Sequence, residues 1–136
     1  MKQSRDVQAF KNELRNYTYY LSRVVSLNNS IEYTYEKLGG LHGVDPSKEP
    51  IHAMPDPNLE WKLRDDIERY EASMRRFQAK IDDIDLVLSK METSLREAIC
   101  DVYARGHTVV KVADKMFLSP SGLKRRMDKE IKKALV

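Results

Sequence analysis

The stretch VVKVADKMFLSPSGLKRRMDKEIKKAL, residues 109–135, decides how the end of this chain folds. It predicts two helices joined by a short turn. The inward face of the first helix holds Val109, Val112, Ala113 and Met116. The second begins at Ser119, a residue type that caps helix N-termini, and is followed by Pro120, which suits the first helical position. Its apolar residues recur every fourth position, at Leu123, Met127, Ile131 and Leu135. This order of elements is typical of a helix-turn-helix.

A third helix precedes these two. The stretch TSLREAICDVYARGHT, residues 93–108, predicts a helix that ends at Gly106. Its inward residues are Leu95, Ile99, Val102 and Tyr103. We therefore expect residues 93–136 to form a small helix-turn-helix domain. Gly122 falls in the first turn of its last helix, where a glycine costs roughly 1 kcal/mol relative to alanine. Close approach of another backbone would explain this glycine, and a solvated helix end is the alternative.

Charge is unevenly distributed along the 136 residues. The net charge is only +3, yet residues 93–136 hold ten Lys/Arg against five Asp/Glu, and residues 1–92 hold fourteen against sixteen. A basic unit attached to a mildly acidic support is the pattern of a nucleic-acid-binding module joined to a second element.

Two long segments carry a coiled-coil pattern. In both, apolar residues alternate at spacings of three and four. The first set is Val7, Phe10, Leu14, Tyr17, Leu21, Val24, Asn28, Ile31, Tyr35 and Leu38, and Asn28 is its one polar member. The second set is Leu63, Ile67, Tyr70, Met74, Phe77, Ile81, Ile84, Leu88, Met91 and Leu95. We expect helices at about 4–38 and 58–92 that form an antiparallel hairpin.

The segment between the two helices, residues 39–57, contains three of the five glycines and four of the five prolines, and so predicts a loop. Residues 1–92 are then one hairpin domain and residues 93–136 the second domain of an all-α protein. The loop contains His42 and His52, but their spacing fits no structural zinc pattern, so we expect no metal and no other cofactor.

The hairpin has more apolar residues than one seam needs. A second apolar flank, which calls for a covering partner, contains Tyr19, Tyr20, Val25, Leu27, Tyr33 and Trp61. A second copy of the chain is the favoured cover, because DNA-binding proteins often act as symmetric pairs. The alternatives are the C-terminal unit or the loop folding over this flank.

Residues 93–135 resemble the promoter-reading C-terminal domain of bacterial sigma factors. The matching features are the Leu95–Tyr103 helix, the small Ala113 in KVADKMFLS, and the stretch SGLKRRMDKEIKKAL. With a long helical N-terminal part, the chain is similar to phage and prophage late-gene regulators of the ArpU/RinA type. This resemblance implies binding to phage promoter DNA and activation of transcription, in some cases through the host RNA polymerase. Phe117 departs from the pattern, since many such modules have glycine in the turn, and it predicts a differently bent turn.

The residue types of the helix-turn-helix indicate how it would bind double-stranded DNA. The expected contacts are His107, Thr108, Lys111, Ser119, Ser121, Gly122, Lys124, Arg125, Arg126, Lys129, Lys132 and Lys133. Backbone N–H groups and hydroxyls at the helix N-terminus suit phosphate oxygens. With Leu123 inward, Lys124 and Arg125 are expected at base edges and Arg126 at a phosphate.

The sequence therefore predicts a cytoplasmic, sequence-specific DNA-binding transcription regulator. We expect no enzyme, because no catalytic constellation stands in a plausible context. Nor do we expect a membrane span or signal peptide, because no apolar run approaches 18 residues and none follows the basic N-terminus. Cys100 reads as a core residue of a chain from a reducing compartment. The alternatives are an adaptor that binds host RNA polymerase or another protein, and a small phage DNA-packaging subunit.

Overall fold

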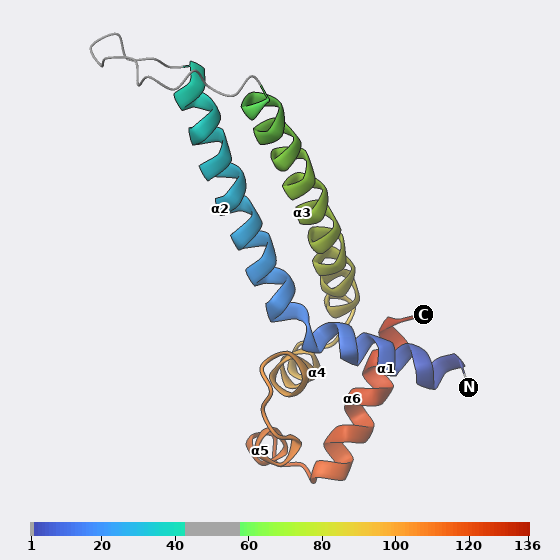
Figure 1. Ribbon diagram of the computed structural model, residues 1–136. Coiled ribbons are helices and arrows are strands. Elements are labelled where there is room, and N and C mark those ends of the chain that lie inside the picture. Colours follow the sequence, from blue (N-terminus) through green and yellow to red (C-terminus); the bar gives the residue numbers. More distant parts are fainter. Residues whose placement is uncertain (1, 43–57) are drawn as a thin grey trace. The chain divides into compact units, whose positions relative to one another are not determined.

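The protein is all-α. The computed structural model describes residues 2–42 and 58–136, and within these ranges there is no strand (Figure 1). The elements are α1 (Lys2–Arg15), α2 (Tyr17–His42), α3 (Leu59–Ser89), α4 (Thr93–Ile99), the π-helix η1 (Cys100–Ala104), α5 (Val109–Lys115) and α6 (Pro120–Ala134). Of the helices described, none is long and apolar enough to cross a membrane.

The first predicted helix is broken at Asn16, so the expectation of one helix over residues 4–38 was wrong. The backbone N–H of Asn16 reaches the carbonyl of Glu13 at 3.1 Å, a three-residue spacing that tightens the turn. Its side-chain Nδ2 donates to the carbonyl of Asn12 at 3.1 Å. Asparagine side chains compete in this way with the backbone ladder, and the competition separates α1 from α2.

The chain divides into units other than the predicted domains 1–92 and 93–136. One unit comprises Met1–Leu21 together with Ala79–Val136, and the other comprises Ser22–Gln78. The reason is that α1 packs against α6 and η1. Its apolar residues Val7, Phe10 and Leu14 are buried. The helix-turn-helix therefore shares its core with α1 and with the ends of α2 and α3.

The buried face of α2 follows a heptad pattern whose phase differs from the prediction. The buried residues of this helix are Tyr20, Leu27, Ile31, Thr34 and Leu38. The expected seam residues Leu21, Asn28 and Tyr35 are exposed instead. Thr34 is compatible with a buried position because its hydroxyl donates to the carbonyl of Ser30 at 2.7 Å. The predicted positions Ile31 and Leu38 belong to both patterns and were right.

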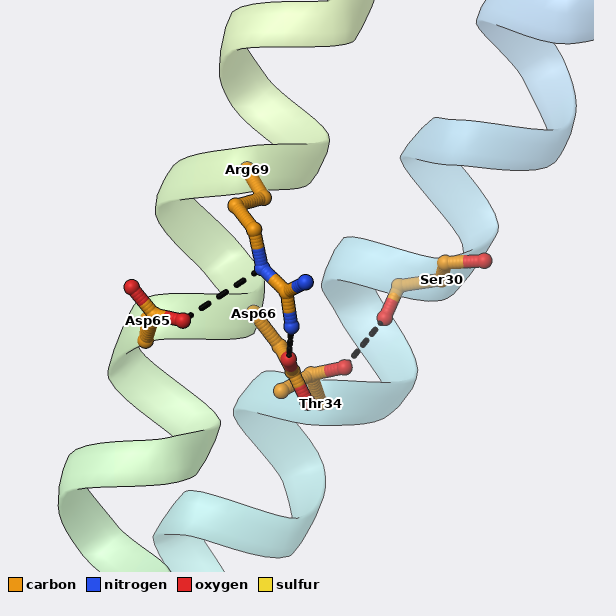
Figure 2. Close-up of polar contacts among 5 residues, drawn as sticks. All are labelled: Ser30, Thr34, Asp65, Asp66 and Arg69. Atoms are coloured by element: carbon orange, nitrogen blue, oxygen red, sulfur yellow. Dashed lines mark hydrogen bonds and ion pairs between the residues drawn. The ribbon is translucent and has the colours of Figure 1, made fainter.

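In the unit Ser22–Gln78, α2 and α3 form an antiparallel helical hairpin. Its buried cluster contains Ile31 and Leu38 of α2 with Leu63 and Ile67 of α3, and Leu59, Tyr70 and Met74 pack against it. Within this unit, the members of the seam predicted for the second helix, from Leu63 to Phe77, are buried or half-buried, as expected. Figure 2 shows some of the polar contacts of this unit: Arg69 pairs with Asp65 and Asp66 on α3, and Thr34 bonds to Ser30 on α2.

The helix ends also differ from the expectation. α2 continues through Gly39 and Gly40 to His42, and both glycines have open space where a side chain would stand. The first helix was expected to stop at these glycines, but a solvated helix surface tolerates glycine at a modest cost in free energy. The remainder of the predicted loop, residues 43–57 with His52, lies outside the described residues.

Candidate nucleic-acid interface

α4 and η1 form the support of the helix-turn-helix. Glu92 caps α4, because its carboxylate accepts hydrogen bonds from the backbone N–H groups of Leu95 at 3.0 Å and Ser94 at 3.1 Å, and these bonds lower the pKa of Glu92. The helix then widens into the π-turn η1, where the N–H of Arg105 donates to the carbonyl of Cys100 at 2.9 Å. Burial raises the pKa of the Cys100 thiol, so this cysteine lacks the activation of a reactive thiolate.

α5 begins at Thr108 and crosses α6 closely. The Thr108 hydroxyl oxygen accepts a hydrogen bond from the backbone N–H of Lys111 at 3.2 Å and so caps the helix. Val112 and Ala113 are buried, and Ala113 has no exposed surface at all. A small residue at this position lets the two helices approach each other, as the sequence indicated.

The turn between α5 and α6 contains a strained, exposed aromatic residue. Phe117 has a φ of 58°, the left-handed conformation that glycine usually adopts at helix ends. In this conformation a side chain costs roughly 1–2 kcal/mol. The turn is closed by a hydrogen bond from the Leu118 N–H to the carbonyl of Ala113 at 3.0 Å. Phe117 thus takes the backbone geometry of a glycine, and its ring stands in solvent with 95% of its surface exposed.

α6 has the expected cap and the expected buried face. The Ser119 hydroxyl oxygen accepts a hydrogen bond from the Gly122 N–H at 3.1 Å, and Pro120 occupies the first turn. The residues that fix the rotation of the helix are buried: Leu123, Met127, Ile131 and Ala134. A Cβ atom at Gly122 would lie 2.8 Å from the Ser119 hydroxyl oxygen. A larger residue at position 122 would therefore require a small shift of the Ser119 side chain, which helix caps of this kind commonly accommodate.

Six cationic side chains of α6 are exposed. They are Lys124, Arg125, Arg126, Lys129, Lys132 and Lys133. At 100° per residue, Arg125 and Lys129 lie opposite the buried row. Within residues 2–42 and 58–136, the ion pairs involve none of these six cations. The exposed face of α6 thus carries a row of positive charges that are unpaired among the described residues.

Lys124 lies on a different side of α6 from Arg125. It borders a hollow shared with α1, whose lining residues are Val7, Gln8, Lys11, Lys124, Asp128 and Lys132. The sequence predicts Lys124 and Arg125 together at base edges, whereas the structure separates them. Arg125 is centred on the outward face, and Lys124 is on the flank beside α1.

A residue that the sequence analysis missed joins α1 to α6. Lys11 is only 7% exposed, and its Nζ lies 2.6 Å from Oδ1 of Asp128 and 5.2 Å from the centre of the Tyr103 ring. Burial opposes the charged form, but the bond to Asp128 and the neighbouring Tyr103 hydroxyl outweigh it and raise the pKa of Lys11. No pattern in the sequence marks Lys11, because a lysine between apolar positions of a helix ordinarily faces water.

The remaining predicted contacts differ in accessibility. Thr108, Lys111, Ser119 and Ser121 are exposed. His107 is half-buried, its backbone N–H donates to the carbonyl of Asp101 at 2.9 Å, and its Nδ1 atom is buried. His107 is therefore a poor candidate for a contact through Nδ1.

The predicted partner surface on the hairpin is divided by burial. Tyr19, Val25, Tyr33 and Trp61 are exposed, as expected for such a surface. Tyr20 and Leu27 are buried, so assigning them to it was wrong. Both belong to the internal face of α2. At these two positions the buried residue precedes the predicted seam residue, Leu21 or Asn28, by one. The Tyr20 hydroxyl donates to Glu13 at 2.8 Å.

The arrangement as a whole is a short helix, a tight turn and a capped helix with a cationic outer face. Cationic side chains of this kind bind anions, and those of an arginine fork also match the paired acceptors of guanine. No known protein-family profile matches the chain, and no curated protein or solved structure matches it significantly.

Proposed function

We propose that this protein is a sequence-specific DNA-binding transcription regulator in which α6 is the recognition helix. The observation that carries the proposal is the set of exposed cations on α6, which form no ion pair among the described residues. Two of them, Arg125 and Lys129, lie opposite the face that Leu123, Met127 and Ile131 lock into the core. A helix with its inner face fixed presents its outer face at a constant angle, as base recognition in the major groove requires.

Within this proposal, Arg125 reads a base edge and its neighbours hold phosphates. An arginine can donate two hydrogen bonds to O6 and N7 of guanine, which is worth about 1–3 kcal/mol of discrimination against another base. Lys129 and Lys133 lie further along the exposed side of the helix. They would follow the DNA backbone and add affinity without sequence preference.

The hairpin of α2 and α3 supplies the partner contact in this proposal. Tyr33 and Trp61 expose large aromatic surfaces on it, and such surfaces are enriched at protein interfaces. The resemblance to phage and prophage late-gene regulators favours a promoter as the DNA target. It also favours a second copy of the chain or the host RNA polymerase as the protein partner.

Selection of bound fragments from random duplex DNA tests this function. Wild-type protein should enrich a defined motif, and Arg125→Ala should relax the preference at one base pair at a cost of about 1–3 kcal/mol. Arg76→Ala is the matched control, since Arg76 is an exposed arginine of the hairpin, and it should leave the motif unchanged. Enrichment of no motif by the wild-type protein would refute sequence-specific binding.

A protein-interaction adaptor is the second candidate, and the exposed Phe117 favours it. A strained backbone with a solvent-exposed aromatic ring often marks a functional contact. An adaptor would keep its activity when Arg125 and Lys129 become alanine. It would lose activity when Phe117 is replaced by glycine, which suits the left-handed turn but removes the ring. The DNA-binding regulator proposed above would instead lose activity when Arg125 and Lys129 become alanine.

A further inference from the structure

The hollow between α1 and α6 brings lysines from two helices together. Lys11 comes from α1, and Lys124 and Lys132 come from α6, two turns apart. The one carboxylate of this lining is Asp128, which stands halfway between the two α6 lysines. All of these residues belong to the same compact unit.

The position of Asp128 makes its pairing informative. It is four residues after Lys124 and four residues before Lys132, and opposite charges at this spacing attract each other along a helix. In an isolated helix Asp128 would therefore neutralise one of the two lysines. In the protein Asp128 pairs instead with Lys11 of α1, at 2.6 Å. The Asp128 side chain is 41% exposed, but its Oδ1 atom is buried, and among the described residues the contact of that atom is the ion pair with Lys11.

Lys11 thereby leaves the two α6 lysines unpaired. Lys124 and Lys132 are exposed, whereas the side chain of Lys11 is only 9% exposed and does not itself meet a ligand. The other carboxylate near Lys132 is Asp6, which lines an adjoining hollow with Lys132 and Lys133 but makes no ion pair with either of them among the described residues. The hollow thus has a net positive charge that α1 maintains.

We propose that Lys124 and Lys132 form a phosphate-binding site beside α1, and that Lys11 is the positioning residue that keeps it cationic by holding Asp128. The ligand is a phosphate group. Identifying it as a phosphate of the DNA backbone rests on the function proposed above. A free phosphate compound would have the same chemistry, and the experiment separates these two sources.

The first arm measures binding to a random-sequence 20-base-pair duplex by fluorescence anisotropy, with the full chain. One phosphate contact contributes about eightfold in affinity near 0.1 M salt, from a slope of about 0.9 per contact. Lys124→Gln and Lys132→Gln should each lose about that factor. Lys11→Met should lose a similar factor, because Asp128 then pairs with an α6 lysine. Lys11→Met with Asp128→Asn should restore the wild-type affinity.

The control is Lys80→Met. Lys80 forms an ion pair between α3 and Glu13 of α1 at 3.8 Å, so its loss changes the net charge equally and also leaves a carboxylate without its cation. Lys80→Met should alter the affinity for the duplex less than twofold. Because Lys11→Met removes an internal contact, Lys11→Arg serves as the second variant. It keeps the charge and should bind duplex DNA like the wild type.

The second arm uses inorganic pyrophosphate and follows backbone amide shifts by NMR. Shifts at residues 124, 128 and 132 that disappear in Lys124→Gln support the site. If the wild type binds no duplex but shows these shifts, the site stands and the DNA-binding proposal fails. If the wild type binds duplex while Lys124→Gln and Lys132→Gln are neutral, the site fails and the DNA-binding proposal stands. Failure of Asp128→Asn to restore binding in Lys11→Met overturns the role of Lys11.

Discussion

Replacing Leu14 by alanine tests the packing of α1 against the helix-turn-helix. Leu14 has no exposed surface, whereas Leu21 is 42% exposed. A continuous coiled coil would have made both leucines equivalent seam residues. A fully buried Leu→Ala change costs about 3–4 kcal/mol, as transfer plus cavity. At Leu21 about half of a transfer energy of about 1.5–3 kcal/mol is lost and no closed cavity forms, which gives about 1 kcal/mol.

The assay is urea unfolding of the full chain, followed by far-ultraviolet circular dichroism. With an m value of about 1.5 kcal/mol/M, Leu14→Ala should lower the midpoint by about 2 M and Leu21→Ala by about 0.7 M. Hydrogen exchange by NMR should show faster exchange in α6 for Leu14→Ala. Equal midpoint shifts for the two variants, with α6 exchange unchanged, would refute the packing of α1 on this unit.

Three further predictions concern helix caps and titrating groups. Ser119→Ala removes the cap of α6 and should cost about 1 kcal/mol in thermal unfolding; an unchanged midpoint would contradict the cap. The pKa of Glu92 is lowered in the folded state, so its stabilisation is complete above the unfolded value of about 4.3 and is lost as the pH falls through the folded value. Unfolding free energies at pH 7 and pH 3 should therefore differ less in Glu92→Gln than in the wild type, and equal differences would contradict this. Burial and the hydrogen bond to Asp85, at 2.8 Å, raise the pKa of Tyr17 to about 12, so its contribution to stability is complete below pH 10 and is lost between pH 10 and about 12. Absorbance at 295 nm should show a titration step near pH 12 that Tyr17→Phe removes.

The helix-turn-helix elements were predictable because their signals are local. Ser119 and Pro120 define the start of α6 by themselves, and the row beginning with Leu123 fixes its inner face. The geometry of the turn between α5 and α6 was harder to predict from the sequence. A phenylalanine at position 117 suggested a different bend, yet hydrogen bonding to Ala113 imposes the glycine-like conformation on it.

The phase of α2 was predictable only in part, because neighbouring positions compete for burial. Tyr35 is more apolar than Thr34, so the pattern favoured Tyr35 for the seam. In the protein Thr34 is buried, and its hydroxyl is satisfied there by a hydrogen bond to the backbone of its own helix. Tyr35 is exposed, and its hydroxyl reaches Glu71 at 3.5 Å.

The pairing of α1 with α6 could not be predicted from the sequence. It depends on a break at Asn16 and on a lysine–aspartate pair separated by more than a hundred residues. Asparagine, lysine and aspartate are all common on helix surfaces, so none of these residues stands out in the sequence. Only the folded chain brings Lys11 to Asp128. In the fold Lys124 lies beside α1, where we propose a phosphate contact, whereas Arg125 lies on the outward face, where we propose a base contact.

The salt dependence of duplex binding tests the central claim, that the exposed cations of α6 contact DNA phosphates. If about five of the six cations of α6 contact phosphates, the slope of log affinity against log salt should be about −4.5, which is about a 500-fold loss of affinity between 50 and 200 mM salt. Changing Lys129 and Lys133, the two lysines assigned to the DNA backbone, to glutamine should reduce the slope by about 2. A slope near zero, or an unchanged slope in this double variant, would contradict the account.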